Sequence, residues 1–425
     1  MKTWIISLLF CLSLSVSAQA PDSLALPWLQ QMARANYPLL QQKEFLANAS
    51  EIRIGQIKDT WLPKVDINAQ ASYQSDVTEL GISNPFFQPP VIDKDIEKIN
   101  LNISQVLFDG KVVRSQKALE AAKLGSEQQN VEIQLYQIKE KINQLFFALV
   151  FFDENRKILD KFHEDLALRL VTAEAGVSNG VLLESLADVI RAELIKMEQK
   201  IMEMDDDRQS ALDLLSLWTG QNLSLSSKLA LPKADISRTA GSKSMRPELL
   251  GFDLQQSQLE AAKTLANTRN IPRISAFGEA GYGKPGYNMF NEGFDTYYML
   301  GAKLSWNLWD WGQAGKEKHI LSFQQELVHS QAATFDLSTK IGAMKQWAEV
   351  QKFRDIMVKD NEIIKLRERI SHSAAAQFDN GVMTSTDYLI ELNQEIQARL
   401  SMETHRLQEV KARVDLLTTL GLDIQ

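Results

Sequence analysis

The sequence predicts a mainly helical protein that also contains a few β-strands of membrane-spanning length. Three observations lead to this class: the two halves of the chain repeat each other, long stretches lack proline, and short segments alternate apolar with polar residues. None of the eleven prolines lies in 91–231 or 286–425. Because an interior proline breaks a helix, each of these stretches can hold long helices.

The first residues predict a secretory signal peptide at 1–18. Lys2 precedes an apolar stretch, and Val16-Ser17-Ala18 has the small side chains of a cleavage site. The only cysteine, Cys11, lies inside this segment, so we expect no disulfide and no cysteine metal site in the mature chain. No later stretch approaches the ~18 consecutive apolar residues that a transmembrane helix needs. We therefore expect a chain that is exported past the inner membrane.

The composition points neither to a nucleic-acid-binding protein nor to an enzyme. The net charge is −8, and the 46 basic and 54 acidic residues are spread along the chain without a basic block. The five histidines stand singly, without the spacing of metal ligands, and no nucleophile is paired with a base. We expect no nucleic-acid partner, no catalytic residue, no metal site and no cofactor.

The two halves of the mature chain repeat each other. Pro38 and Pro63 are matched 209 residues later by Pro247 and Pro272. Downstream the offset falls to 201 and stays there, as these matches show: Asp109 with Asp310, Asn179-Gly180-Val181 with Asn380-Gly381-Val382, and Gly220 with Gly421. We divide the chain into a first repeat at 19–225, a linker or equatorial segment at 226–245 and a second repeat at 246–425.

Each repeat is predicted to contain one β-hairpin, at 64–107 in the first repeat and at 273–308 in the second. Residues 65–74 and 99–104 alternate apolar with polar side chains, and 274–282 and 298–306 do so again, although Phe277 falls on a polar position. About ten residues per strand is the length that a tilted strand needs to cross an outer membrane. A soluble four-stranded sheet with ordinary core aromatics is the alternative.

Aromatic residues collect at both ends of these strands, as in the interfacial girdles of membrane barrels. On the loop side they are Phe86, Phe87, Tyr287, Phe290, Phe294 and Tyr297, and on the helix side they are Trp61, Trp306, Trp309 and Trp311. Four strands cannot close a barrel, and open edges in lipid would leave backbone groups unpaired at several kcal/mol each. If the strands span a membrane, several chains must share one barrel, and three chains would give twelve strands.

After each β-hairpin the sequence predicts a hairpin of two long helices. From about 111 to 178 the apolar residues follow a heptad pattern, best seen at Leu135, Ile138, Ile142, Leu145, Leu149 and Phe152. A second apolar seam runs from Leu186 to Met204, after an Asn179-Gly180 pair that fits a left-handed helix cap. At 1.5 Å per residue the first helix would be roughly 100 Å long. The second repeat places its helices at about 313–379 and 383–419.

The order and spacing of several short motifs resemble the TolC-like outer-membrane efflux family over essentially the whole mature chain. The motifs are Asn36-Tyr37-Pro38, Trp61-Leu62-Pro63, Leu107-Phe108-Asp109-Gly110, Asn270-Ile271-Pro272-Arg273, Leu308-Trp309-Asp310-Trp311-Gly312 and the turns around Gly180 and Gly381. The resemblance implies a homotrimer, with a twelve-stranded β-barrel in the outer membrane and an α-barrel tunnel in the periplasm.

The resemblance also implies a passive duct of a tripartite efflux pump or type I secretion system. Such a duct would sit in outer-membrane lipid and join an inner-membrane transporter through a periplasmic adaptor. Neither the cargo nor the class of pump follows from the sequence. A periplasmic coiled-coil adaptor or scaffold is the alternative, but an adaptor usually has one helical hairpin, whereas this chain has two, each with a strand pair.

The family resemblance places adaptor docking at the two helical turns: Asn179, Gly180, Val181, Asn380, Gly381 and Val382. It also points to Asp387 as a candidate for the periplasmic gate, and to Asp379 as a second candidate. The glycines would be needed as turn formers in any case, and Asp387 could instead be a carboxylate at a helix start. The first repeat differs here, because the 201-residue offset puts Leu186 opposite Asp387.

Overall fold

The computed structural model describes residues 23–78, 92–224, 227–237, 243–289, 291 and 293–424. The predicted signal peptide at 1–18 and the loop aromatics Phe86, Phe87 and Phe290 lie outside the described residues. The chain divides into two compact units. The hairpin unit contains the chain up to Leu40 together with Leu135–Arg246 and Ser338–Gln425, and the sheet unit contains Gln41–Gln134 and Pro247–Leu337. Each unit therefore takes segments from both predicted repeats.

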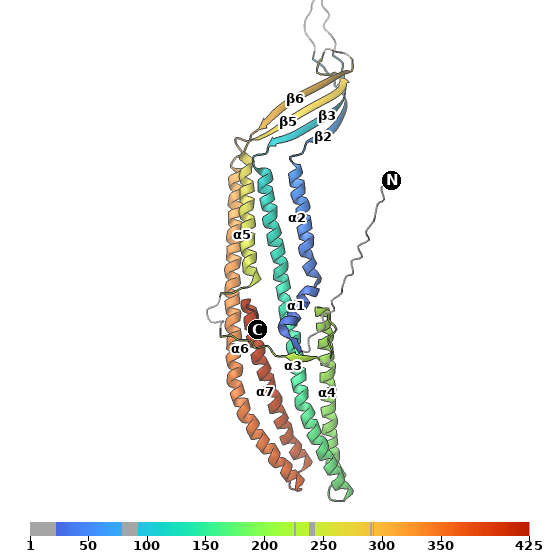
Figure 1. The fold of residues 1–425 in the computed structure, drawn as a ribbon, viewed down its shortest axis with the longest axis vertical. Helices are drawn as coiled ribbons and strands as arrows, with labels where there is room; N and C mark the ends of the chain where they lie inside the picture. Colours follow the sequence, from blue (N-terminus) through green and yellow to red (C-terminus); the bar gives the residue numbers. More distant parts are fainter. Residues whose placement is uncertain are drawn as a thin grey trace, which may run out of the picture. The chain divides into compact units, whose positions relative to one another are not determined.

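The sheet unit is built around four antiparallel strands in the order β2-β3-β5-β6 (Figure 1). The strands are β2 (Lys64–Tyr73), β3 (Asp95–Phe108), β5 (Arg273–Lys284) and β6 (Asp295–Ser305). Helix α2 (Gln42–Asp59), helix α5 (Pro247–Ala266) and the first parts of α3 (Val112–Ser178) and α6 (Gln313–Asp379) complete the unit. The four predicted strands are present, and β3 extends beyond 99–104 because its first residues pair with the end of β2.

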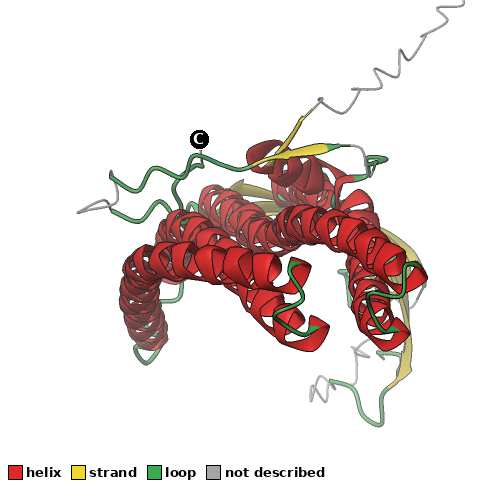
Figure 2. Cartoon of the chain, turned by 90° about the horizontal axis from the view of Figure 1, so that it is seen from below, coloured by secondary structure: helices red, strands yellow, loops and turns green. Residues whose placement is uncertain are grey.

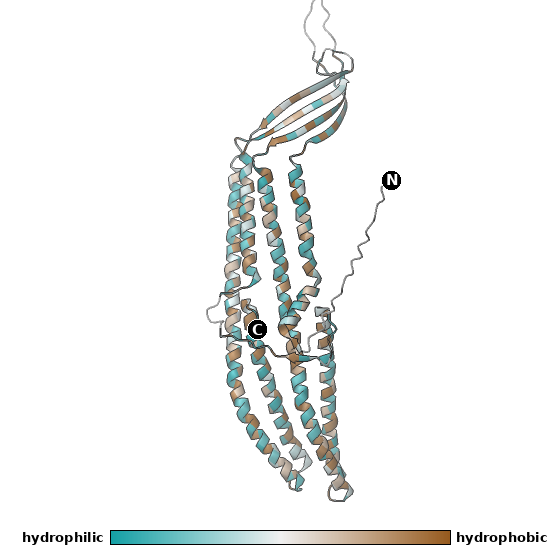
Figure 3. Ribbon diagram, viewed as in Figure 1, coloured by the Kyte–Doolittle hydropathy of each residue, from teal (hydrophilic) through white to brown (hydrophobic). Residues whose placement is uncertain are grey.

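The sheet has one apolar and one polar face. On one face the paired rows are Val65, Ile103, Gly278 and Leu300, followed by Ile67, Leu101, Ala280 and Tyr298. The row between them, on the other face, is Asp66, Asn102, Glu279 and Met299. The alternation read along each strand thus stays in register across all four strands. Figure 3 shows hydrophobic and hydrophilic residues following each other along the strands.

Aromatic side chains on the polar face cover glycines of the neighbouring strand. A Cβ at Gly301 would come within 2.6 Å of the Phe277 ring, and a Cβ at Gly281 within 2.4 Å of the Tyr297 ring. The absence of these Cβ atoms gives the rings room to lie across the strand, which accounts for Phe277 at a polar position. Tyr297, one of the predicted membrane-interface aromatics, is only 8% exposed and lies on the polar face. The adjacent Tyr298 is 77% exposed and lies on the apolar face.

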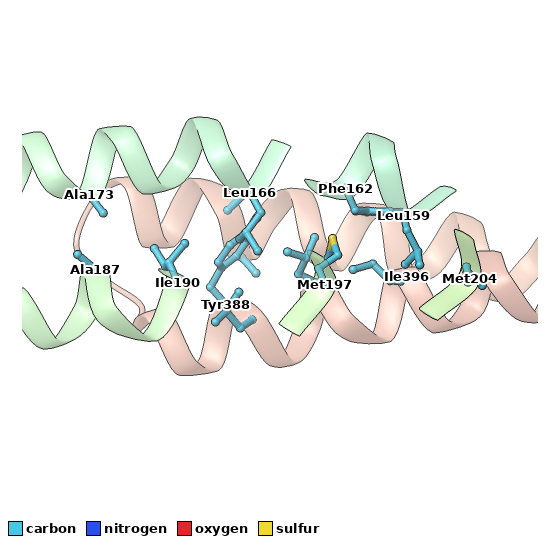
Figure 4. Close-up of a cluster of buried hydrophobic side chains, with 14 residues drawn as sticks. Leu159, Phe162, Leu166, Ala173, Ala187, Ile190, Met197, Met204, Tyr388 and Ile396 are labelled. Carbon is cyan, nitrogen blue, oxygen red and sulfur yellow. The ribbon is translucent and has the colours of Figure 1, made fainter. Parts of the chain in front are cut away.

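Two antiparallel helical hairpins make up most of the hairpin unit. One joins α3 to α4 (Glu184–Thr219), and the other joins α6 to α7 (Ser385–Leu420). Helices α3 and α6 both have 67 residues, and α4 and α7 both have 36. Most residues of the predicted seams are buried. Those of the second seam, from Ile190 to Met204, join the part of α3 from Leu159 onward, and residues of α6 and α7, in one core (Figure 4). Its labelled members include Leu159, Phe162, Leu166, Ile190, Met197, Tyr388 and Ile396.

The start of the chain packs into the hairpin unit through contacts that the sequence did not indicate. Strand β1 (Ser23–Ala25) pairs in parallel with β4 (Lys228–Ala230), which lies within the predicted linker at 226–245. Helix α1 (Leu26–Asn36) follows, and its Gln30 donates a hydrogen bond to Asn143 at 2.6 Å. Asn143 donates in turn to Thr418 at 3.2 Å. This buried polar chain fixes α1, α3 and α7 relative to one another.

Two loops of the same design lead from the sheet, one into α3 and the other into α6. The Asp109 carboxylate accepts from the backbone N–H of Lys111 at 2.9 Å and of Val113 at 2.6 Å. The Asp310 carboxylate accepts from Gly312 and Ala314, both at 2.9 Å. Each loop holds two successive residues at positive φ, Gly110-Lys111 in one and Trp311-Gly312 in the other. These aspartates satisfy N–H groups that a helix start leaves unpaired.

No helix among the described residues is both long enough and apolar enough to cross a membrane.

Candidate functional site

The candidate site is the end of the hairpin unit where α3 turns into α4 and α6 turns into α7 (Figure 2). Gly180 and Gly381 both adopt positive φ, at +72° and +71°. The N–H of Val181 donates to the carbonyl of Gly176 at 2.9 Å, and that of Val382 donates to Gln377 at 2.8 Å. This is the pattern of a Schellman cap, in which glycine is favoured because a side chain would be strained. The left-handed caps predicted at both turns are confirmed.

The residues of these turns divide into those that build the turn and those that face outward. The side-chain amides of Asn179 and Asn380 donate back to their own helices, to Ala175 at 2.9 Å and Ala376 at 2.7 Å. Val181 is 78% exposed and Val382 is 76% exposed. The apolar surface that a partner could contact at the turns therefore comes from these valines, with exposed Leu183 beside Val181.

Asp387 contacts Thr384, the N-cap residue of α7. Thr384 accepts a hydrogen bond from the Asp387 N–H at 3.2 Å, and its hydroxyl donates to the Asp387 carboxylate at 2.7 Å. The first contact is an N-cap, and a carboxylate is also favoured at a helix start by the helix dipole. The equivalent position before α4 is Leu183, which makes no side-chain cap. The structural role that the sequence left open for Asp387 is thus present in the structure.

Asp379, at the end of α6, is bound to an arginine of the other hairpin. Arg169 on α3 contacts the Asp379 carboxylate at 3.1 Å, and its guanidinium carbon lies 4.9 Å from the centre of the Tyr388 ring on α7. The Tyr388 ring also stacks on Phe378, with centroids 5.4 Å apart. A single arginine therefore links α3 to both helices of the second hairpin by an ion pair and a cation–π contact.

Arg169 and Tyr388 also line a cavity of about 360 Å³ between the hairpins. Its walls carry three acidic residues, Asp165, Glu368 and Glu395, and three basic residues, Lys161, Arg169 and Arg399. Glu395 is 8% exposed and accepts from Arg399 at 2.9 Å. Apolar packing is therefore interrupted where the hairpins meet, and paired charges surround the gap.

Burial raises the pKa of Tyr388 to about 12, although the nearby Arg169 guanidinium acts in the opposite direction. The phenol is therefore neutral at physiological pH. Its ring can stack under the arginine without placing a second charge in this buried position.

The predicted interface tryptophans lie in the sheet unit, just beyond β6. Trp306, Trp309 and Trp311 are all exposed. The Trp306 indole N–H donates to the carbonyl of Asn270 at 3.0 Å, and the rings of Trp309 and Trp311 meet edge to face at 6.0 Å. Exposed tryptophans at the end of a strand are typical of a protein that contacts a lipid interface.

The raised pKa of Tyr388 predicts that the folded protein loses stability at alkaline pH. Since the folded state raises this pKa, the stabilisation is fully present below the unfolded value near 10 and is lost as pH rises toward about 12. We expect a loss of about 2–3 kcal/mol across that range, from the two-unit shift. Chemical unfolding of the purified protein would measure it. Tyr388→Phe keeps the ring and should lose less stability over the same range; equal losses in the two proteins would contradict the assignment.

No protein-family model and no curated protein matches the chain. Solved structures do match. The Campylobacter jejuni CmeC outer membrane channel is 16% identical with a TM-score of 0.63, over 93% of this chain and 85% of that one. The Vibrio cholerae outer membrane protein VceC is 13% identical with a TM-score of 0.66, over 94% and 97%.

The open state of the Neisseria gonorrhoeae MtrE outer membrane channel is 13% identical with a TM-score of 0.64, over 93% of this chain and 89% of that one. These likenesses extend over nearly the whole chain at low identity, so they concern the fold. The resemblance read from the motifs is confirmed at that level: the chain has the fold of the TolC-like outer-membrane channels.

Proposed function

We propose that this chain is one subunit of a homotrimeric duct in the outer membrane, through which cargo passes passively out of a periplasmic helical tunnel. The observation that carries the proposal is the four-stranded sheet, which is apolar on one face, polar on the other and unpaired along two edges. An apolar face suits lipid, and a polar face suits a water-filled lumen. The outer-membrane channels that share the fold support the same location.

The edges of the sheet favour an assembly of several chains. In the described sheet, β2 pairs only with β3, and β6 pairs only with β5. Backbone groups left open in lipid are strongly disfavoured, so β6 of one copy would have to pair with β2 of the next. Three copies would close a barrel of twelve strands.

Apolar residues on the helices of the sheet unit support the same assembly. Ile320, Phe323 and Leu327 are spaced by three and four residues on α6, and all three are exposed. Phe45 and Ile52 on α2 are exposed as well. An apolar helix stripe of this kind normally packs against another helix, and neighbouring copies of the chain would supply one.

We further propose that the helical turns dock a periplasmic adaptor, which connects the duct to an inner-membrane transporter. The exposed Val181 and Val382 offer apolar contacts at the two turns. Asn179, Gly180, Asn380 and Gly381 would hold these valines in position through the caps described above. In this proposal the glycines and asparagines act by shaping the turn.

We propose Asp379 as the stronger gate candidate, because its ion pair with Arg169 joins the two hairpins. Opening would require the hairpins to separate at this end, and the ion pair resists that movement. Asp387 remains a second candidate, although its carboxylate already accepts a hydrogen bond from Thr384.

Detergent extracts of outer membranes test the assembly, since the native protein should have three times the mass of one mature chain. Phe323 is 71% exposed on the α6 stripe. Phe323→Glu should shift the protein largely to monomer, because it would bury a carboxylate in an apolar contact. His329→Glu adds the same charge on another face of α6 and should leave the trimer intact. A monomeric mass for the unaltered protein would overturn the proposal of a shared duct.

Conductance in planar bilayers tests the gate. Asp379→Asn should raise the open-channel conductance, because the uncharged amide no longer holds Arg169 by an ion pair. Asp387→Asn should lower the preference for cations if Asp387 lines the constriction, and Thr384 can still cap the helix. Asp387 is not part of the gate if conductance and cation preference are both unchanged. An unaltered conductance in Asp379→Asn would remove the ion pair from the mechanism.

Cross-linking in cells, followed by purification of the duct, tests adaptor docking. Val181→Asp and Val382→Asp should each reduce recovery of an adaptor, because a charge replaces an exposed apolar contact at a turn. Met202→Asp is the matched control, since Met202 is 67% exposed on α4 away from the turns. All three variants should remain trimeric. Normal adaptor recovery with both valine variants would argue against docking at the turns.

A further inference from the structure

Two carboxylates lie on the polar face of the sheet, within the part whose other face is apolar. Asp66 lies between Val65 and Ile67 on β2, and Glu279 lies between Gly278 and Ala280 on β5. Both are paired with Asn102 of β3, so they belong to one hydrogen-bonded row. The rows on either side of them on the apolar face contain no charged residue.

This placement requires water on the polar face, provided that the sheet spans the membrane as proposed above. Ionised side chains at membrane depth are tolerated where they line a water-filled cavity, and rings of Asp and Glu are a common basis of cation selectivity in channels. Asp66 and Glu279 would therefore face the lumen. Each further copy of the chain would add another pair.

The charges around the pair leave an excess of acid. The row that holds Asp66 and Glu279 has no basic residue. Among the paired positions of the two adjacent polar-face rows, Lys64 is the only charged residue. Over these three rows, two acids against one base give a net charge of −1 per copy. The rows beyond them hold Lys303 on one side, and Lys98 with Asp295 on the other, toward the two ends of the strands.

Hydrogen bonding holds Glu279 in place on this face. The Asn100 side chain donates to the Glu279 carboxylate at 2.8 Å, and Asn102 donates to Asn100 at 3.4 Å. In the next row the Tyr297 ring lies over Gly281, and its hydroxyl is buried without a hydrogen-bond partner among the residues that the structure describes.

We propose that Asp66 and Glu279 form a band of carboxylates inside the barrel that selects for cationic solutes at the level of the sheet. The band acts separately from any carboxylate at the helical turns. It would concentrate small inorganic and organic cations in the lumen and disfavour anions of the same size. The inference rests on the proposed duct, and it assigns part of the charge selectivity to the membrane-spanning part of the chain.

A single cysteine in the lumen can report the local potential. Asn68 lies one row from the carboxylates on the same face, and the only native cysteine, Cys11, lies in the predicted signal peptide. Asn68→Cys would be exposed in outer-membrane preparations to a cationic and to an anionic methanethiosulfonate reagent. Each rate would be divided by the rate of the same reagent with free cysteine. The cationic reagent should be favoured.

Neutralising the band should remove this preference. Asp66→Asn with Glu279→Gln keeps the side-chain sizes, and the glutamine oxygen can still accept from Asn100. In the Asn68→Cys background we expect the normalised rate ratio to fall by about threefold or more, since oriented charges can change local ion concentrations by larger factors. Glu97→Gln makes the same chemical change on the other face of β3, near the loops, and should leave the ratio unchanged.

Ile67→Cys separates failure of this inference from failure of the duct. Ile67 is on the apolar face, so its cysteine should react far more slowly than that of Asn68→Cys. Comparable reaction at both positions, or no reaction at Asn68→Cys, would overturn the water-filled barrel and the inference together. With Ile67→Cys protected and Asn68→Cys reactive, a rate ratio that neutralisation leaves unchanged would overturn the inference alone.

Discussion

Strands β2 and β6 each pair on one side only, which leaves a row of backbone N–H and C=O groups along each edge of the described sheet. In water such an edge can be solvated, but in lipid it must be paired. The sheet is also too small to close on itself. In the proposed duct, the apolar face, the polar face and the exposed stripe on α6 are parts of one arrangement, in which the chain completes its hydrogen bonding and apolar packing with further copies of itself.

The helices meet a related constraint in a different way. Each hairpin is thin, so it buries only a narrow apolar seam, and polar contacts supply the remaining specificity. Glu409 is almost fully buried between α6 and α7, where it accepts from Arg354 at 2.9 Å and also from Arg413. A buried, fully paired charge of this kind stabilises little compared with an apolar core, but it permits one alignment of the helices and disfavours shifted ones. The Gln30–Asn143–Thr418 chain acts similarly where α1 joins the bundle.

The two turns have the same backbone design but different surroundings. Both use a glycine at positive φ and an asparagine that caps its own helix. Only the second is followed by a helix with a side-chain N-cap, in which Thr384 accepts from the Asp387 N–H, whereas the N-cap residue of α4 is Leu183, which has no such side chain. The contact that unites the hairpins comes instead from Arg169, which reaches Asp379 and Tyr388 together. Similar turns can therefore have different roles, since their neighbours differ.

Local pattern in the sequence was sufficient to predict the long helices, the four strands, their two faces and the glycine turns, because each depends on periodicity or backbone conformation within a few residues. It could not reveal the β1–β4 pair, since three-residue strands carry no periodic signal. Nor could it reveal that Arg169 meets Asp379, or that Tyr297 covers Gly281 on the polar face. Those contacts join segments that are distant along the chain. Only the packed structure therefore decides which side chains meet and which charged groups are paired.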